Sequence, residues 1–283
     1  MLAYRHGFHA GMHADVLKHV VLMQVLRRMG QKDKAYTFVD SHAGAGGYSL
    51  EGDFAHKTGE YLTGIARLWE RTDLPPALAE YVGLVRAFGN ERKLTQYPGS
   101  PGVANLLVRP QDKLHLYELH PTDERILRGF LGKRPNTAIT LGDGFAAIEK
   151  ELPPQSRRGV LLIDPSYELT ADYTRTLGAV REAIARFATG VVLVWVPQLA
   201  TVESRELPRR LLKAAAAAPK GVLHARLTVA EADARGFGLI GSSMVVINPP
   251  HGLAETMREV LPYLVNVLGQ FDSATFLLDT KAA

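Results

Sequence analysis

The residues best suited to chemistry are Asp164-Pro165-Ser166-Tyr167, which directly follow the buried-strand pattern of residues 159–163. Such a loop could act on the N6 amine of an adenine, a poor nucleophile because its lone pair is delocalised into the ring. A carboxylate and a backbone carbonyl that accept the two N–H hydrogens would restore electron density at the nitrogen. Proline holds that carbonyl in place by fixing the backbone. We therefore predict that Asp164 and the Pro165 carbonyl are the catalytic acceptors.

This tetrad also ends in an aromatic residue. We predict that the face of Tyr167 stacks on a base that has been removed from its helix. Methyl transfer then needs no covalent enzyme intermediate, because the activated amine attacks a sulfonium methyl group in line. Tyr167 therefore joins Asp164 and Pro165 as a predicted catalytic residue.

A second motif, Asn248-Pro249-Pro250-His251, also follows a predicted strand and is similar to the tetrad of amino-methylating enzymes. Its strand is the last of the series and is expected to be antiparallel, so its end would face away from the ligand edge of the sheet. We predict that Asn248 ends a strand in a turn.

Acidic residues end four successive predicted strands. The strands are predicted at 35–39, 114–117, 137–141 and 159–163, and they end at or near Asp40, Glu118, Asp143 and Asp164. A single acid in such a position is often a helix cap. Four acids at one edge of a parallel sheet, where ligands bind, favour a ligand site instead.

Small residues follow the first of these acids, in the turn 42–47 (HAGAGG). Their backbone can approach a ligand closely. A nicotinamide cofactor is disfavoured, because the spacing G-x-G-x-x-G fails at Ser49. Glu118 is placed to accept hydrogen bonds from a ribose diol, and Asp143 to receive the adenine amine of the same ligand.

Strand and helix patterns alternate along most of the chain. The alternation predicts an α/β fold with a mostly parallel, doubly wound, Rossmann-like sheet. Two closing strands, at 222–229 and 243–247, are predicted as a hairpin. We divide the chain into residues 1–50 (N-terminal tail, helix and first strand with the glycine turn), residues 51–98 (a small helical insert) and residues 99–283 (the remainder of the same domain). Helices are predicted over residues 13–29, 121–132, 144–152, 171–187 and 209–218.

Composition limits the class of protein. The 283 residues are 46% hydrophobic, which predicts a globular chain with a sizeable core. Without cysteine neither a disulfide nor a thiolate metal site can form, and we expect no metal cofactor.

The N-terminus lacks the apolar core of a signal peptide and no stretch is long enough to cross a bilayer, so we expect a cytoplasmic protein with no membrane partner. The sequence pI of about 9.2 permits an anionic partner.

Cationic residues gather near the N-terminus, with Asp15 as the only acid among them. They are Arg5, His6, His9, His13, Lys18, His19, Arg27 and Arg28. Such a run predicts either phosphate binding or a solvated helix face.

With these motifs together, the sequence resembles the RlmJ family of bacterial large-subunit ribosomal RNA adenine-N6 methyltransferases. The resemblance covers nearly the whole chain and rests on several separated motifs in one order. They are Tyr4-Arg5-His6, residues 8–11 (FHAG), 13–19 (HADVLKH), 42–46 (HAGAG), 97–101 (YPGSP), 118–121 (ELHP) and Asp143-Gly144. The chain departs from the family at Ser166, where a second proline is usual.

The resemblance implies a class I methyltransferase fold with Asp164 as the catalytic residue. It implies S-adenosylmethionine as the cofactor, contacted at His19, His42, Ser100, Glu118, Asp143, Gly144 and Asp164. It also implies that Tyr4, His6 and Lys18 engage the RNA substrate. The implied target is adenine 2030 of 23S ribosomal RNA, methylated by a monomer in free RNA or in an early assembly intermediate.

Two alternatives remain open. The same chemistry could act on DNA, although the sequence shows no separate domain for reading a duplex. The chain could also be an RNA-binding protein that keeps the fold without catalysis. The acid series and the Asp-Pro-x-Tyr loop oppose this second reading, since RNA binding alone requires neither.

Overall fold

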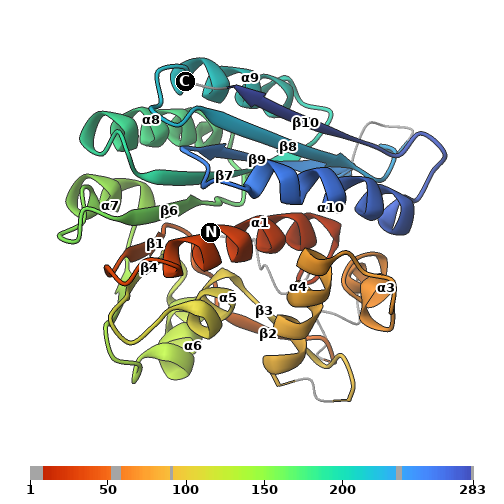
Figure 1. Ribbon diagram of the computed structural model, residues 1–283, viewed down its shortest axis with the longest axis horizontal. Coiled ribbons are helices and arrows are strands. Elements are labelled where there is room, and N and C mark those ends of the chain that lie inside the picture. Colours follow the sequence, from red (N-terminus) through yellow and green to blue (C-terminus); the bar gives the residue numbers. More distant parts are fainter. Residues whose placement is uncertain (1–8, 52–58, 90–91, 234–237, 282–283) are drawn as a thin grey trace.

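The centre of the fold is an eight-stranded sheet with the order β10-β8-β9-β7-β6-β1-β4-β5 (Figure 1). The computed structural model describes residues 9–51, 59–89, 92–233 and 238–281. Five neighbouring strands are parallel: β7 (Val191–Gln198), β6 (Gly159–Ile163), β1 (Thr37–Asp40), β4 (Lys113–Glu118) and β5 (Thr137–Leu141). The sheet closes with β9 (Gly241–Ile247), which is antiparallel to both β7 and β8 (Val222–Thr228), and with β10 (Thr275–Lys281), antiparallel to β8. The predicted α/β class and the mostly parallel sheet with a closing antiparallel strand are confirmed.

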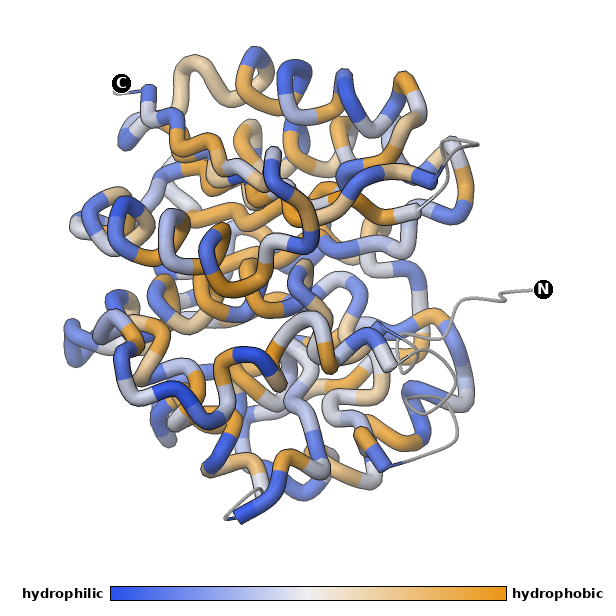
Figure 2. The backbone as a smooth tube through the Cα atoms, turned by 90° about the vertical axis from the view of Figure 1, so that its right-hand side faces the viewer, coloured by the Kyte–Doolittle hydropathy of each residue, from blue (hydrophilic) through white to orange (hydrophobic). Residues whose placement is uncertain are grey.

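Helices cover both faces of the sheet. One face carries α1 (His13–Gly30), α5 (Ser100–Leu107), α6 (Pro121–Leu131) and α10 (Leu253–Leu268), and the other carries α7 (Gly144–Glu151), α8 (Thr170–Arg186) and α9 (Val202–Ala214). Along β6, Val160 and Leu162 pack into the first layer, whereas Leu161 and Ile163 pack into the second. Side chains that are apolar on both faces are typical of a buried parallel strand. Hydrophobic segments accordingly run through the middle of the fold (Figure 2).

The described residues of the region 51–98 form short helices and one strand. These are the 3-10 helix η2 (Glu60–Thr63), α3 (Ala66–Trp69), α4 (Pro76–Ala87) and β3 (Gln96–Pro98). A two-stranded sheet forms where β3 pairs with β2 (Gly47–Ser49), directly after the glycine turn. Ile65, Leu68 and Leu78 belong to the same hydrophobic core as α1. The helices agree with a helical insert, whereas the division of the chain at residues 51 and 98 stays a prediction.

Helix α1, predicted over residues 13–29, is buried on all sides over most of its length. Every residue of α1 from His13 to Leu26 is buried, because α4, α5, α10 and β9 all pack against the helix. The solvated-face interpretation of the N-terminal cations is therefore wrong for Lys18 and His19, which are 4% and 0% exposed. These polar side chains are buried with partners, described below.

Several boundaries and elements differ from the sequence patterns. The helix expected over 209–218 is α9, which begins earlier and ends at Ala214. The strands β2, β3 and β10 and the helix α10 were not predicted. Within the described ranges, no helix combines the length and the apolar character that crossing a bilayer requires.

Candidate active site

A cavity opens at the carboxyl edge of the parallel strands, beside β1, which lies between β4 and β6 in the sheet. Its empty volume is about 1270 Å³, which includes the open mouth. The predicted site residues that line it are Lys18, His42, Ser100, Glu118, Asp143, Gly144, Asp164 and Pro165. Ligands of open α/β sheets bind at such an edge. The structure therefore brings most of the predicted residues to one cavity.

A buried lysine holds the Asp164 carboxylate. Lys18 Nζ donates to Asp164 Oδ2 at 2.7 Å and lies 2.8 Å from Asp15 Oδ1. Burial opposes the charge of Lys18, but the two carboxylates outweigh it and raise the pKa of the ammonium well above its ordinary value. The lysine therefore stays charged and fixes one oxygen of Asp164, while Asp164 still lines the cavity.

Glu118 closes the glycine turn. Its Oε2 accepts the Gly44 N–H at 2.8 Å, and its Oε1 accepts the His120 N–H at 2.7 Å. Burial raises the pKa of the Glu118 carboxyl despite these two bonds. Each carboxylate oxygen carries two lone pairs, so Glu118 keeps the capacity to accept from ribose hydroxyls. The φ of Gly44 is +60°, a backbone conformation that favours glycine.

Asp143 is both a helix cap and a cavity residue. Its Oδ1 accepts the Phe145 N–H at 3.0 Å at the start of α7, and its Oδ2 forms an ion pair with Arg175. His42 packs edge-on against Phe145, with 4.7 Å between ring centroids. Burial lowers the pKa of His42 to about 4, so its imidazole is neutral at neutral pH.

Two contacts behind the cavity fix the loops that line it. Ser100 Oγ donates to Asp40 Oδ2 at 2.6 Å, and Asp40 is fully buried beneath the lining rather than part of it. Burial raises the pKa of Asp40 to about 7. At Gly144 a Cβ would lie 1.8 Å from the Ser41 carbonyl oxygen, so the loops after β1 and β5 meet too closely for any side chain.

Tyr167 lies in the core and does not line the cavity. Its backbone has a φ of 55°, in the left-handed region, and its side chain is 6% exposed. The ring lies 4.7 Å from Tyr173 and 6.0 Å from Trp195 between centroids, and the hydroxyl donates to the Trp195 carbonyl at 2.8 Å. In this position the ring is not placed to stack on a base, so its stacking role stays a prediction that requires the loop to turn.

Trp195, in contrast, does line the cavity. Lys18 Nζ lies 5.9 Å from the indole centroid, and the indole Nε1 is buried with no hydrogen-bond partner among the described residues. From the sequence, Trp195 was assigned no role. The signal for it is the position of an aromatic residue near the carboxyl end of the parallel strand next to β6.

Two predicted residues of the N-terminal tail cannot be placed, and one histidine is away from the cavity. Tyr4 and His6 lie outside the described residues. His19 is fully buried, its Nδ1 is 2.9 Å from Tyr97 Oη, and it is not among the residues that line the cavity. Its predicted cofactor contact stays a prediction.

The competing motif at Asn248 has a structural role. It follows β9, which is antiparallel, at the opposite edge of the sheet. The Asn248 amide donates to the carbonyls of Ala188 and Gly190, each at 2.8 Å. The prediction that Asn248 ends a strand in a turn is confirmed.

Comparison with known proteins decides the family. The family model described as "Ribosomal RNA large subunit methyltransferase D, RlmJ" matches residues 33–276. The chain belongs to the RlmJ family.

Relatives of the RlmJ family match nearly the full length of the chain. It is 44% identical over 264 residues to "Ribosomal RNA large subunit methyltransferase J" of Escherichia coli (strain K12), covering 93% of each protein. It is 43% identical over 270 residues to the protein of the same name from Haemophilus influenzae, covering 95% of this chain and 94% of that one. The crystal structure of protein LPL1258 from Legionella pneumophila superposes with a TM-score of 0.86 at 29% identity, covering 96% of this chain and 98% of that chain.

Membership of the RlmJ family confirms the resemblance drawn from the separated motifs. The high TM-score extends the likeness to the whole fold, including the closing strands beyond the parallel series. Within the part of the chain that the structure describes, no group of three or more His, Asp or Glu side chains is arranged to hold a metal ion.

Proposed function

We propose that this chain transfers the methyl group of S-adenosylmethionine to the N6 amine of adenine 2030 in 23S ribosomal RNA. Family membership supports the reaction class. The observation that carries the chemistry is that one cavity is lined both by Gly44 and Glu118 and by Asp164 and Pro165. A nucleoside cofactor and a target base can therefore meet in it.

The cofactor side of the cavity fits S-adenosylmethionine. When bound, this cofactor supplies an electrophilic methyl group on a sulfonium. Glu118 has lone pairs for the ribose hydroxyls, and the apolar Leu119 and Phe145 line the same cavity. We assign Asp143, which also lines it, to the adenine amine. At Gly144 the chain lies so close to the loop after β1 that no side chain would fit there. We also assign His19, His42 and Ser100 to cofactor binding, although His19 is buried against Tyr97 and does not itself line the cavity.

On the substrate side, Asp164 and the Pro165 carbonyl accept the two N–H hydrogens of the target amine. This polarises the nitrogen for in-line attack on the methyl carbon, after the base has been flipped into the cavity. The carbon–sulfur bond breaks as the carbon–nitrogen bond forms, and Asp164 helps the proton leave the nitrogen after methylation. Lys18 acts through Asp164, since its ammonium is buried against that carboxylate rather than open to phosphates. Tyr167 stacks on the base after the loop turns its ring outward, and Tyr4 and His6 contact the RNA. The substrate is free RNA or an early assembly intermediate, bound in the cytoplasm by a monomer.

Methyl transfer to protein-free 23S ribosomal RNA tests the proposal. Purified protein is incubated with radiolabelled S-adenosylmethionine and either this RNA or duplex DNA of equal adenine content. We expect label in the RNA, mapped to one adenine as N6-methyladenine, and little in the DNA. A clear preference for DNA would overturn the choice of substrate. No binding of S-adenosylmethionine in calorimetry would favour a non-catalytic RNA-binding protein.

A further inference from the structure

The edge of the sheet opposite the cavity carries a dense group of cations. The segments that lead into four parallel strands, 31–36, 108–113, 132–136 and 153–158, contain eight Lys and Arg residues and two acids. The cations are Lys32, Lys34, Arg109, Lys113, Lys133, Arg134, Arg157 and Arg158, and the acids are Asp33 and Asp112. Their excess of positive charge exceeds the net charge of +4 of the whole chain. We refer to these eight residues as the amino-edge cluster.

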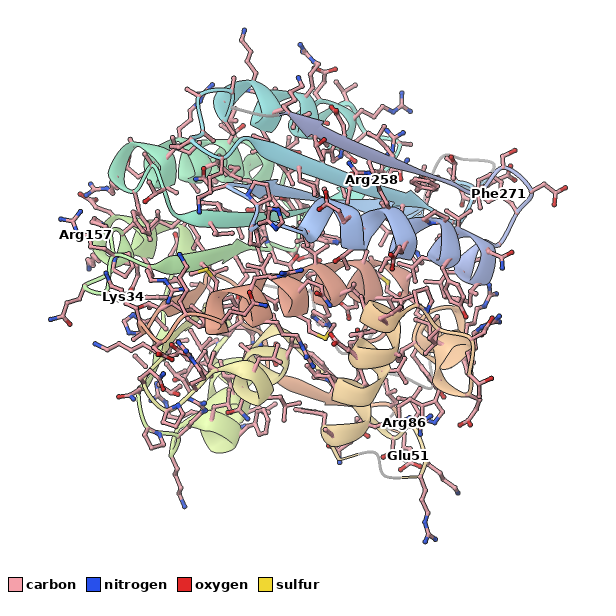
Figure 3. All side chains as sticks on the ribbon, in the orientation of Figure 1. Lys34, Glu51, Arg86, Arg157, Arg258 and Phe271 are labelled. Atoms are coloured by element: carbon pink, nitrogen blue, oxygen red, sulfur yellow. The ribbon has the colours of Figure 1, made fainter. Side chains whose placement is uncertain are left out.

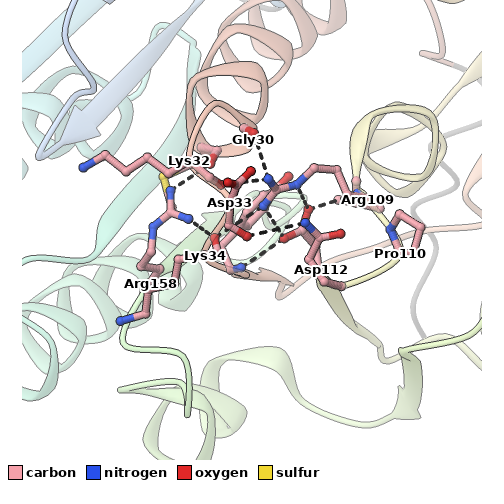
Figure 4. Close-up of polar contacts among 12 residues, drawn as sticks. Gly30, Lys32, Asp33, Lys34, Arg109, Pro110, Asp112 and Arg158 are labelled. Atoms are coloured by element: carbon pink, nitrogen blue, oxygen red, sulfur yellow. Dashed lines mark hydrogen bonds and ion pairs between the residues drawn. The ribbon is translucent and has the colours of Figure 1, made fainter.

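Three arginines of the amino-edge cluster have structural partners. Arg109 donates to the carbonyls of Gly30 and Lys32 at 2.9 and 2.7 Å and pairs with buried Asp112 (Figure 4). Arg158 donates to the Met29 carbonyl at 2.7 Å, and Arg134 to the Val108 carbonyl at 3.0 Å. Carbonyls at the carboxyl end of α1 attract cations. These hydrogen bonds give the three arginines a structural role, but they do not explain the exposed members of the cluster.

The exposed members of the cluster outnumber the one exposed acid beside them, Asp33. Lys32, Lys34 and Arg157 are exposed, and no ion pair of their side chains is found among the described residues. Lys34 and Arg157 project from the same side of the molecule (Figure 3). The cations also repel one another: burial and the neighbouring Arg109 lower the pKa of the Arg158 guanidinium. The Tyr36 hydroxyl is buried without a hydrogen-bond partner among the described residues, and the Arg109 guanidinium lies 6.0 Å from the centroid of its ring.

We infer that the amino-edge cluster binds the phosphodiester backbone of the RNA substrate at a distance from the modified base. The inference rests on the proposed function, since it takes the RNA as the ligand. Helix α1 connects the two sites: Lys18 lines the cavity, and the Gly30 carbonyl is bound within the cluster. Twelve residues of helix separate them, or about 18 Å at 1.5 Å per residue. A stacked RNA strand that reaches both sites must therefore extend roughly five nucleotides beyond the target, at about 3.4 Å per nucleotide.

The test compares two triple variants with the same change of charge. Lys32→Glu with Lys34→Glu and Arg157→Glu alters the exposed part of the cluster. Arg205→Glu with Arg210→Glu and Lys213→Glu alters three exposed cations of α9 and is the matched control. Binding of a long 23S fragment is measured over a range of salt concentrations, with S-adenosylmethionine affinity and thermal unfolding as checks on the fold.

We expect the cluster variant to bind the long fragment about tenfold or more weakly than the wild type. A plot of the logarithm of the binding constant against the logarithm of the salt concentration should be less steep by about two. Each lost phosphate contact removes roughly 0.7 to 0.9 from this slope. Turnover at saturating RNA and cofactor affinity should be unchanged. An RNA trimmed to three nucleotides on each side of the target should bind the wild type and the cluster variant alike.

Equal effects of both triple variants would show a general response to charge and overturn the inference. So would an unchanged affinity of the cluster variant for the long fragment. Failure of the proposed function is distinct from either result, because the wild-type protein would then not methylate the RNA at all.

Discussion

Lys18 on α1 and Asp164 after β6 meet across 2.7 Å although 146 residues separate them in the sequence. Asp15 holds the other side of the same ammonium at 2.8 Å. This ion pair links α1, which contains the family motif of residues 13–19, to the predicted catalytic loop. It makes the position of the catalytic carboxylate depend on the packing of α1.

Lys18→Met should lower both stability and activity. The substitution leaves Asp15 and Asp164 as neighbouring carboxylates without their cation, and breaking a buried ion pair costs roughly 3 to 5 kcal/mol. Urea unfolding measures the stability and labelled methyl incorporation measures the transfer. The double variant Lys18→Met with Asp15→Asn should recover part of the stability without recovering transfer. An unchanged unfolding midpoint for the single variant would contradict the buried triad.

Asp164→Asn should nearly abolish methyl transfer while S-adenosylmethionine still binds. The amide keeps the shape of the side chain but offers one acceptor oxygen and no charge, and loss of such an electrostatic contact costs about 100- to 1000-fold in turnover. Asp164→Ala is a poorer test, since it also removes a partner of Lys18. Turnover and calorimetric cofactor affinity are measured on the same preparation. Near-normal turnover of the purified Asn variant would refute the catalytic role.

Strand ends could be predicted from the sequence because their signals are local. Apolar runs followed by Asp40, Glu118 and Asp164 locate three parallel strands and the edge at which they end. The alternation of strands and helices predicts the rest of the parallel sheet, because crossovers between parallel strands are right-handed. Glu118 and Asp164 therefore line the cavity as the pattern predicts.

Features that depend on distant contacts could not be predicted. The direction of the Tyr167 ring follows from a positive φ and from packing against Tyr173 and Trp195. The burial of Lys18 requires α4, α5 and α10 to surround α1, and the polar residues of that helix gave it the pattern of a surface helix. Strand β10 is an edge strand whose side chains are mostly partly or fully exposed, so its pattern is weak.

Two substitutions of Tyr167 test whether its ring leaves the core. Both Tyr167→Phe and Tyr167→Leu remove the hydroxyl that donates to the Trp195 carbonyl, at a cost of about 1 kcal/mol for that bond. The Phe variant keeps an aromatic face and should retain methyl transfer. The Leu variant should lose tenfold or more in kcat/KM for RNA, since stacking on a base contributes about 1 to 3 kcal/mol. Equal transfer by the two variants would show that the ring stays in the core.

Gly144→Ala should weaken cofactor binding, and Gly142→Ala should not. A Cβ at Gly144 would lie 1.8 Å from the Ser41 carbonyl oxygen, so the loop after β1 must move. At Gly142 the nearest atom to an added Cβ is Thr140 Cγ2, at an ordinary 3.8 Å. Calorimetry with S-adenosylmethionine should give a loss of tenfold or more for Gly144→Ala alone. Similar affinities for both variants would argue against the close contact between the loops.

Asp40→Asn should change how stability depends on pH. Burial raises the pKa of Asp40 from its usual 3.8 to about 7, so the folded protein binds a proton there more tightly than the unfolded chain does. This contribution to stability is fully present below pH 4 and is lost as the pH rises through about 7, at roughly 1.4 kcal/mol per pKa unit. Asparagine has no such titration and can still accept from Ser100.

The buried histidines His13, His42 and His224, with pKa values lowered to about 4, act in the opposite direction in both proteins. The difference in unfolding free energy between variant and wild type should therefore shift in favour of the variant from pH 5 to pH 8. A difference that stays constant over this range would mean that Asp40 ionises in the folded protein at its ordinary pKa.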